Sequence, residues 1–186
     1  MPETLTAPNW HALYRSRLVS AEQAAATVRS GDHVYIPIGQ TPNAVIGALA
    51  ARRDELENVT VTCLPVADYG WLAPEFAGSF TVNVIYAGPF TRAAVESGAA
   101  DYTPFMIYGA HKARDEGREE ARPIDVNLIG VTPPNERGYV SLGHVVWDAK
   151  STVRRAARTI ATVNEHLPRT FGDSWLHVSE IDLFVE

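Results

Sequence analysis

The sequence predicts an α/β fold, a mostly parallel open sheet with helices on both faces, from three observations. Short apolar runs alternate along the chain with stretches of helical spacing, as they do in parallel sheets covered by helices. The run Asp125–Val131 is almost continuously apolar, which is typical of a strand buried on both faces. Such runs end on Pro or Gly, and Pro133-Pro134 cannot continue a strand because proline has no N–H to donate.

The first half of the chain predicts a lead, residues 1–18, followed by alternating elements. Residues 1–8 are expected to be loose, and residues 10–18 have apolar side chains at helical spacing. Ser20 and Gln23 have the spacing of a capping box at the start of a helix. The expected elements are a helix at Ala21–Arg29, a strand at His33–Ile38, a helix at Pro42–Arg53, a strand at Asn58–Leu64, one helical turn within 66–79, a strand at Phe80–Tyr86 and a helix at Thr91–Ser97.

The second half continues the alternation around Asp125–Val131. Residues 100–108 have a strand-like composition that Pro104 interrupts, and the charge-dense run 111–122 predicts a solvated helix or loop. The remaining expected elements are a helix at Asp148–Arg158, a strand at Thr159–Asn164, a turn at Pro168–Gly172, a short extended piece at Leu176–Val178 and a strand at Ile181–Val185. Length and pattern together predict a single domain, residues 1–186, and its apolar end suggests docking on a further unit.

Composition excludes several classes of protein. The net charge of -6 and the absence of a long basic run argue against nucleic-acid binding. No apolar stretch approaches the roughly 20 residues of a membrane span, and the N-terminus lacks the features of a signal peptide. The single cysteine, Cys63, rules out an internal disulfide and suits a reducing compartment. We therefore expect a cytoplasmic protein without nucleic-acid or membrane partners.

No motif describes a complete active site. The six histidines form no pair at metal-ligand spacing, and neither glycine-rich phosphate-binding motif is present. The chain also lacks the Gly-x-Ser-x-Gly pattern of a nucleophile elbow. What remains are the loops at the C-terminal ends of the strands, the edge at which open α/β sheets bind ligands.

Three such loops and one histidine are candidates for binding. They contribute the predicted site residues Gly39, Gln40, Pro42, Arg92, Pro133, Asn135, Glu136, Gly138 and His144. The first two loops each open a helix, whose free N–H groups favour an anion, and Arg92 is suited to a phosphate or a carboxylate. The alternatives stay open: ordinary turns, a surface arginine, a solvated loop at 133–138 and a structural histidine.

Several stretches together resemble the N-terminal half of the acetyl-CoA hydrolase/transferase family, which includes 4-hydroxybutyrate and succinyl-CoA:acetate CoA-transferases. Nearly the whole chain after residue 18 is covered in order. The matching stretches are Ser20–Ala24, Ser30–Val34, Ile36–Gly39 with Pro42, Gly88–Pro104, Ile124–Val126, Pro133–Gly143, Lys150, Val163-Asn164, Pro168–Ser174 and His177–Asp182.

The resemblance implies a CoA-transferase domain of the NagB/RpiA-like type and an active site between two such domains. Proteins of this family use a glutamate of the second domain, which attacks an acyl-CoA and then carries CoA as a thioester. Coenzyme A is thus implied as part of the substrate, with no metal. The family pattern also has a glutamate at the position of Glu136 without using it as the nucleophile.

This sequence departs from the family pattern near the implied site. Asn127, Thr132 and Asn135 replace the usual Ala, Ser and Asp, and Val145 and Trp147 replace a serine and an aspartate. Trp147 therefore joins the predicted substrate-binding residues. The two replacements predict a more apolar cleft and a larger acyl group.

The resemblance implies one subunit of a split CoA-transferase or acyl-CoA hydrolase, inactive until a partner subunit supplies the glutamate. We expect a heterodimer or a dimer of heterodimers that acts on an acyl-CoA or a carrier-protein thioester. One alternative is a repurposed scaffold that hydrolyses, cyclises or dehydrates a thioester in a biosynthetic pathway. Another is a non-catalytic subunit that binds a partner.

Overall fold

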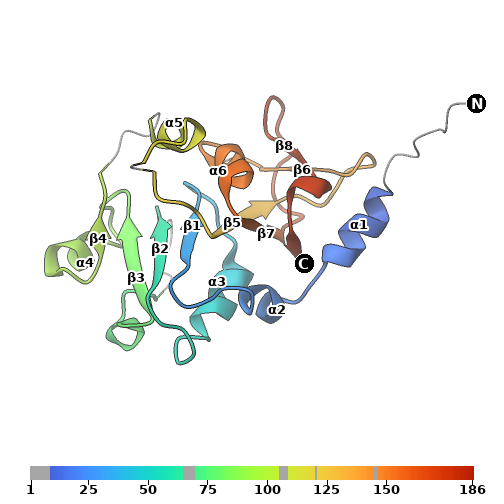
Figure 1. Cartoon of the computed structure of the whole chain (residues 1–186). Coiled ribbons are helices and arrows are strands. Elements are labelled where there is room, and N and C mark those ends of the chain that lie inside the picture. The colour runs from blue at the N-terminus through green and yellow to red at the C-terminus, as the bar shows by residue number, and fades with distance from the viewer. Residues whose placement is uncertain (1–8, 65–69, 105–108, 120, 145) are drawn as a thin grey trace, which may run out of the picture.

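The computed structural model describes residues 9–64, 70–104, 109–119, 121–144 and 146–186. Within them, seven parallel strands form one sheet in the order β4-β3-β2-β1-β5-β7-β9 (Figure 1). The strands are β1 (His33–Ile36), β2 (Val59–Cys63), β3 (Phe80–Val84), β4 (Asp101–Tyr102), β5 (Val126–Val131), β7 (Arg158–Val163) and β9 (Leu183–Val185). The predicted α/β class with a mostly parallel open sheet is confirmed.

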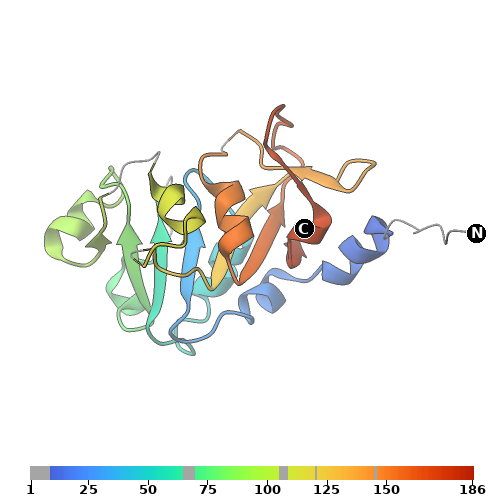
Figure 2. The ribbon, with the colours of Figure 1, turned by 45° about the horizontal axis from the view of Figure 1, so that its top comes forward.

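Helices lie on both faces of the sheet, as predicted (Figures 1 and 2). α2 (Ala21–Ala25) and α3 (Asn43–Ala50) pack on one face, and α5 (Ala110–Asp115) and α6 (Ala149–Arg155) cover part of the other. The shorter elements are η1 (Pro74–Phe76), α4 (Arg92–Ser97) and η2 (Val178–Glu180). None of the helices in the described ranges is long and apolar enough to cross a membrane.

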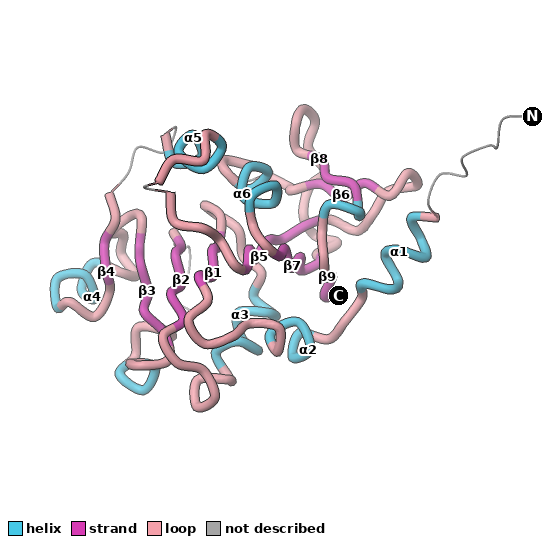
Figure 3. The backbone as a smooth tube through the Cα atoms, viewed as in Figure 1, coloured by secondary structure: helices cyan, strands magenta, loops and turns pink. Residues whose placement is uncertain are grey.

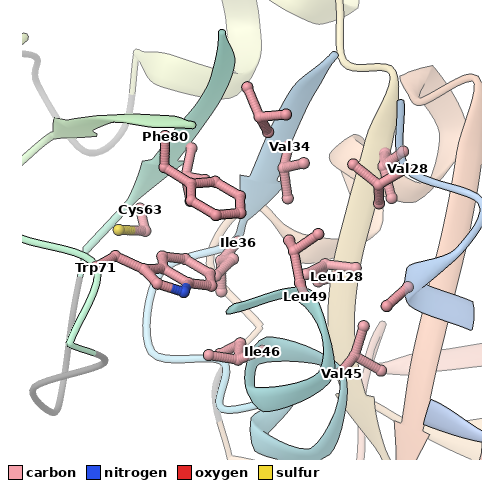
Figure 4. Close-up of a cluster of buried hydrophobic side chains, with 14 of the residues drawn as sticks. Val28, Val34, Ile36, Val45, Ile46, Leu49, Cys63, Trp71, Phe80 and Leu128 are labelled. Atoms are coloured by element: carbon pink, nitrogen blue, oxygen red, sulfur yellow. The ribbon is translucent and has the colours of Figure 1, made fainter. Parts of the chain in front are cut away.

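The main hydrophobic core fills the space between the sheet and α2 and α3 (Figure 4). The side chains of Val34 and Ile36 alternate with those of His33 and Tyr35, so one side of β1 is apolar and the other is polar. Trp71 stacks on Phe80, with ring centroids 5.9 Å apart, at the edge of this core. The central members of the main core are Val34, Ile36, Val45, Ile46, Leu49, Val61 and Leu128.

A second core lies on the opposite face, over β5, β7 and β9. α1 (Trp10–Arg17) contributes Tyr14, whose ring centroid is 4.7 Å from that of the fully buried Phe184. The segment after α1 runs beside β9, because Val19 donates its N–H to the carbonyl of Phe184 at 2.9 Å. The predicted helix within the lead is therefore part of the folded unit.

A small antiparallel sheet of two strands lies outside the main sheet (Figure 3). Its residues Val140 and Leu176 belong to the second core. β6 (Tyr139–Ser141) pairs with β8 (Trp175–His177). The extended piece near Leu176 was predicted, but β6 was not. Three residues after the Gly138 turn are too few for a clear alternation.

Several predicted boundaries are corrected. The helix expected over 148–158 ends at Arg155, because Arg158 already pairs with Val126 at the start of β7. The helix expected over 21–29 ends at Ala25, and the capping box of Ser20 is confirmed. The strand-like stretch at 100–108 has only Asp101–Tyr102 in the sheet among its described residues. Residues 1–8 and 105–108 lie outside the described residues.

Candidate functional site

A small cleft opens at the C-terminal ends of β1, β5 and β7. The chain places β2 on one side of β1 and β5 on the other, so the strand order reverses here. Open α/β sheets bind their ligands at such a switch point. The cleft has a volume of about 190 Å³. Its polar lining comes from Gln40, Thr41, Asn43, His144, Thr162 and Asn164.

Gln40 holds the walls of this cleft together. Its side chain is only 4% exposed, its Oε1 accepts a 2.7 Å hydrogen bond from the N–H of Gly130, and its Nε2 donates to the carbonyl of Leu142 at 3.4 Å. Gly39 precedes it with φ +74°, a conformation that glycine adopts without strain. Gln40 thus connects the loop after β1 to the end of β5 and to the residue that follows β6.

The cleft can accept or donate hydrogen bonds, but its described lining contains no carboxylate or thiol. Thr162 Oγ1 is buried without a hydrogen-bond partner among the described residues. Leu142, Val163 and Leu167 supply apolar surface. The arrangement suits a short uncharged group that carries a carbonyl or a hydroxyl, and its described lining offers no carboxylate to act as the nucleophile.

The sequence-predicted residues are brought together only in part. Gly39, Gln40 and His144 line the cleft, and buried Pro42 caps the start of α3 next to it. Trp147 is 58% exposed and does not line the cleft. Val145 lies outside the described residues.

Arg92 stands apart from the cleft, at the start of α4 and beyond the end of β3. Its side chain is exposed. The turn before it is closed by Thr91, whose Oγ1 accepts from the N–H of Gly88 at 3.1 Å and donates to the carbonyl of Tyr86 at 3.3 Å. The turn is therefore built by local hydrogen bonds, and its role in binding stays a prediction.

The loop at 133–138 is held by its own side chains. Asn135 Oδ1 accepts from the N–H groups of Arg137 and Tyr139 at 2.9 and 3.0 Å, and the carbonyl of Pro133 accepts from Arg169 at 2.8 Å. Such a turn fixes its backbone without a ligand. Glu136 is exposed at the tip of the loop and does not line the cleft.

Gly138 serves close packing with α1. Its φ is +78°, and a Cβ atom at this position would lie 2.7 Å from Cγ and 2.9 Å from Cβ of Trp10. Only glycine fits in both respects. Gly138 was predicted as a binding residue. Its close neighbour in the structure is the side chain of Trp10, and its role in binding stays a prediction.

Two potentially reactive side chains, those of Cys63 and His33, are buried in the fold and have structural roles. Burial raises the pKa of the Cys63 thiol to about 12, so Cys63 is not a thiolate nucleophile. Burial also lowers the pKa of His33. The His33 ring nitrogens contact the carbonyl of Pro123 at 2.6 Å and Thr62 Oγ1 at 2.8 Å, which accounts for both nitrogens of a neutral imidazole. In the described part of the chain, no cluster of three His, Cys, Asp or Glu side chains could hold a metal.

A second, larger opening of about 820 Å³ lies over the polar side of β1, β2 and β3. Tyr35 and Arg114 line it together with His33, Thr62 and Asn83. The sequence analysis did not single out Tyr35 or Arg114 as site residues. The alternation of polar and apolar side chains in β1 was the signal that could have indicated a polar face of the sheet. Asp148, which contacts Tyr35, was also missed, because an acid at the start of a helix is expected to be a cap.

A family model, the acetyl-CoA hydrolase/transferase N-terminal domain, matches residues 4–186. The 4-hydroxybutyrate coenzyme A transferase of Clostridium kluyveri is 34% identical over 180 residues, which cover 95% of this chain and 41% of that protein. The succinyl-CoA:cyclohexane-1-carboxylate CoA transferase of Geobacter metallireducens is 31% identical over 174 residues, 93% of this chain and 39% of that protein.

Solved structures agree with these matches. The crystal structure of RipA from Yersinia pestis superposes with a TM-score of 0.83 at 26% identity, covering 95% of this chain and 43% of that chain. The chain spans about two fifths of the length of the curated relatives it matches.

Proposed function

Since the chain belongs to the acetyl-CoA hydrolase/transferase family, we propose that it forms the N-terminal-domain half of a CoA-transferase-like enzyme acting on an acyl thioester. The match to the N-terminal domain of that family, over almost the whole chain, carries the proposal. CoA enters as part of the substrate, and a carrier-protein thioester offers the same reacting group. No metal takes part in the proposed chemistry.

We place the nucleophilic glutamate on a second CoA-transferase-type domain that a partner subunit contributes. The described cleft supports this placement because no carboxylate lines it. A glutamate entering beside Gln40 would attack the thioester carbonyl, and the acyl group would pass to that carboxylate as CoA leaves. Glu136, exposed at a loop tip, is not assigned this role.

The partner would cover apolar side chains that this chain exposes. Phe171 is 99% exposed and Trp147 58%, and neither is expected to face water in a permanent complex. We propose a heterodimer or a dimer of heterodimers with an interface above about 2,000 Å², the range of obligate complexes. The partner would then close the cleft at the switch point, at the C-terminal ends of the strands.

The purified chain alone is expected to show no CoA-transferase turnover with acetyl-CoA and a series of carboxylates. The physical reason is that no carboxylate lines the described cleft, so the proposed glutamate nucleophile is not part of it. The assay measures exchange of CoA with and without the product of a neighbouring reading frame that encodes a second CoA-transferase-type domain. Turnover by the isolated chain well above background would contradict the proposal.

The same assay separates the alternatives. Loss of thioester without any carboxylate acceptor, in the paired enzyme, would identify a hydrolase or another repurposed activity. Stable pairing without any reaction of a thioester would identify a partner-binding subunit. Transfer to a carboxylate supports the proposed activity.

Trp147→Asp tests the expected preference for a larger acyl group. The substitution restores the residue of the family pattern, and we expect it to shift the kcat/KM ratio of the paired enzyme toward short acyl thioesters, about tenfold. One or two methylene groups in an apolar pocket account for a change of this size. Tyr86→Asp is the matched control, because it also places an acid at an exposed aromatic position, and Tyr86 is not among the side chains assigned to the partner interface. An unchanged ratio in Trp147→Asp would show that Trp147 does not face the acyl group.

A further inference from the structure

The side chain of Asp148 is buried at the start of α6 and links three parts of the chain. It is 2% exposed, although it caps none of the N–H groups of its own helix. Its Oδ2 accepts a 2.5 Å hydrogen bond from the hydroxyl of Tyr35, which is itself fully buried. Its Oδ1 accepts from the N–H of Ile38 at 3.3 Å. A buried carboxylate needs such partners.

Arg114 of α5 compensates the charge of Asp148. One guanidinium nitrogen lies 3.6 Å from Asp148 Oδ2, and the guanidinium group stacks over the ring of Tyr35 at 4.3 Å from the centroid. The Arg114 side chain is 14% exposed, so water screens this ion pair only weakly. Burial and the negative charge of Asp148 raise the pKa of Tyr35, which therefore remains a hydrogen-bond donor.

The contact with Ile38 connects this group to the candidate site. β1 ends at Ile36, and Pro37 has no N–H, so Ile38 offers the first free N–H of the loop. The carbonyl of Pro37 then accepts from the N–H of Gln40 at 3.0 Å. Asp148 therefore holds Ile38, the second residue of a turn that begins at Pro37 and ends at Gln40, and Gln40 bonds to Gly130 in the cleft.

We infer that Asp148 is a positioning residue, which sets the loop at 37–40 and through it the Gln40 side chain that shapes the cleft. Tyr35 and Arg114 hold the carboxylate in place for this task. The position of the loop follows from the contacts alone. Its consequence for turnover rests on the proposed function.

Amide hydrogen exchange of the chain itself tests the positioning step. In Asp148→Asn we expect about tenfold faster exchange at Ile38, which loses a charged acceptor, and also at Gly130, whose acceptor is Gln40 Oε1. The exchange rate at Gly130 is the decisive measurement. Asp148 does not contact Gly130 directly, so a change there must be transmitted through the loop and Gln40. Ile160 in the buried β7 reports whether the sheet stays intact. The matched control is Asp173→Asn, which removes an exposed acid paired with Lys150 of the same helix.

Tyr35→Phe provides a second variant, because it removes one hydrogen bond to Asp148 and keeps the ion pair. We expect a smaller effect of about threefold at the same two amides, and this variant decides the question if Asp148→Asn does not fold. Unchanged exchange at Gly130 in the folded variants would overturn the inference.

Turnover with the partner provides the second readout. We expect kcat/KM to fall about tenfold in Asp148→Asn, mainly through kcat, and to stay unchanged in Asp173→Asn. Faster exchange at Gly130 with unchanged turnover would overturn the positioning role in catalysis. A wild-type pair without any turnover would overturn the proposed function, while the exchange measurement would still decide the role of Asp148 in the loop.

Discussion

Gly138→Ala is expected to destabilise the fold by about 3 kcal/mol. A left-handed conformation costs a non-glycine residue roughly 1–2 kcal/mol, and overpacking adds about 1–3 kcal/mol. The overpacking is severe here, because the new Cβ would lie 2.9 Å from Cβ of Trp10, an atom that moves only with the backbone of α1. Thermal unfolding measures the effect, which corresponds to a loss of roughly 6–12 °C in Tm for a chain of this size.

Gly172→Ala isolates the two contributions. Gly172 also has a positive φ, +92°, but no atom lies within 4 Å of a Cβ at that position. This control should lose only about 1–2 kcal/mol from backbone strain. Equal losses in the two variants would show that Gly138 does not pack against Trp10.

Gln40→Ala is expected to lower kcat/KM of the paired enzyme about 100-fold, the effect of a misplacement of roughly 1 Å in a site. The variant removes the acceptor of the Gly130 N–H and the donor to Leu142, so three segments around the cleft lose their connection. An unpaired N–H also costs about 1–3 kcal/mol of stability if water does not replace the acceptor. Steady-state kinetics and thermal unfolding measure the two effects separately.

Gln23→Ala is the matched control for Gln40→Ala. Gln23 also makes a side-chain hydrogen bond to the backbone, in the capping box of Ser20, but it is exposed and does not line the cleft. We expect a small loss of stability and no change in kcat/KM. If Gln40→Ala retained full turnover at an unchanged stability, the cleft at the switch point would not be the reacting site.

The elements that could be predicted are those whose cause is local. Val126, Leu128, Ile129 and Val131 predicted a buried strand, and all six residues of β5 are buried, while the Ser20 capping box is complete within four residues. Element ends were less accurate, because tertiary pairing decides them. Arg158 pairs with Val126, and this contact ends the preceding helix before the place that its own sequence suggests.

The sequence predicted the part of the candidate site that lies where the ends of the parallel strands converge. Gln40 and His144 meet at one cleft, as the edge rule for parallel sheets implies. Gly138 was predicted as a binding residue. In the structure it packs on Trp10, and its role in binding stays a prediction. A sequence cannot distinguish these cases, because both need a glycine with a positive φ.

The interaction of Asp148 with Tyr35 and Arg114 could not be predicted, because the three residues are distant in the chain. Tyr35, Arg114 and Asp148 come from β1, α5 and α6 and meet only in the folded protein. Each residue also has an ordinary local explanation: a strand tyrosine, a charge in a solvated helix and an N-cap. Only the burial of the carboxylate reveals the shared role.

The most direct test of the proposed function is to locate the covalent intermediate. The chain and its partner are incubated with an acyl-CoA in the absence of acceptor, and mass spectrometry of the digested subunits identifies the residue that carries CoA. We predict a glutamyl-CoA thioester on a glutamate of the partner and none on this chain, Glu136 included. A thioester on any glutamate of this chain would contradict the proposal that it supplies only the N-terminal-domain half of the active site.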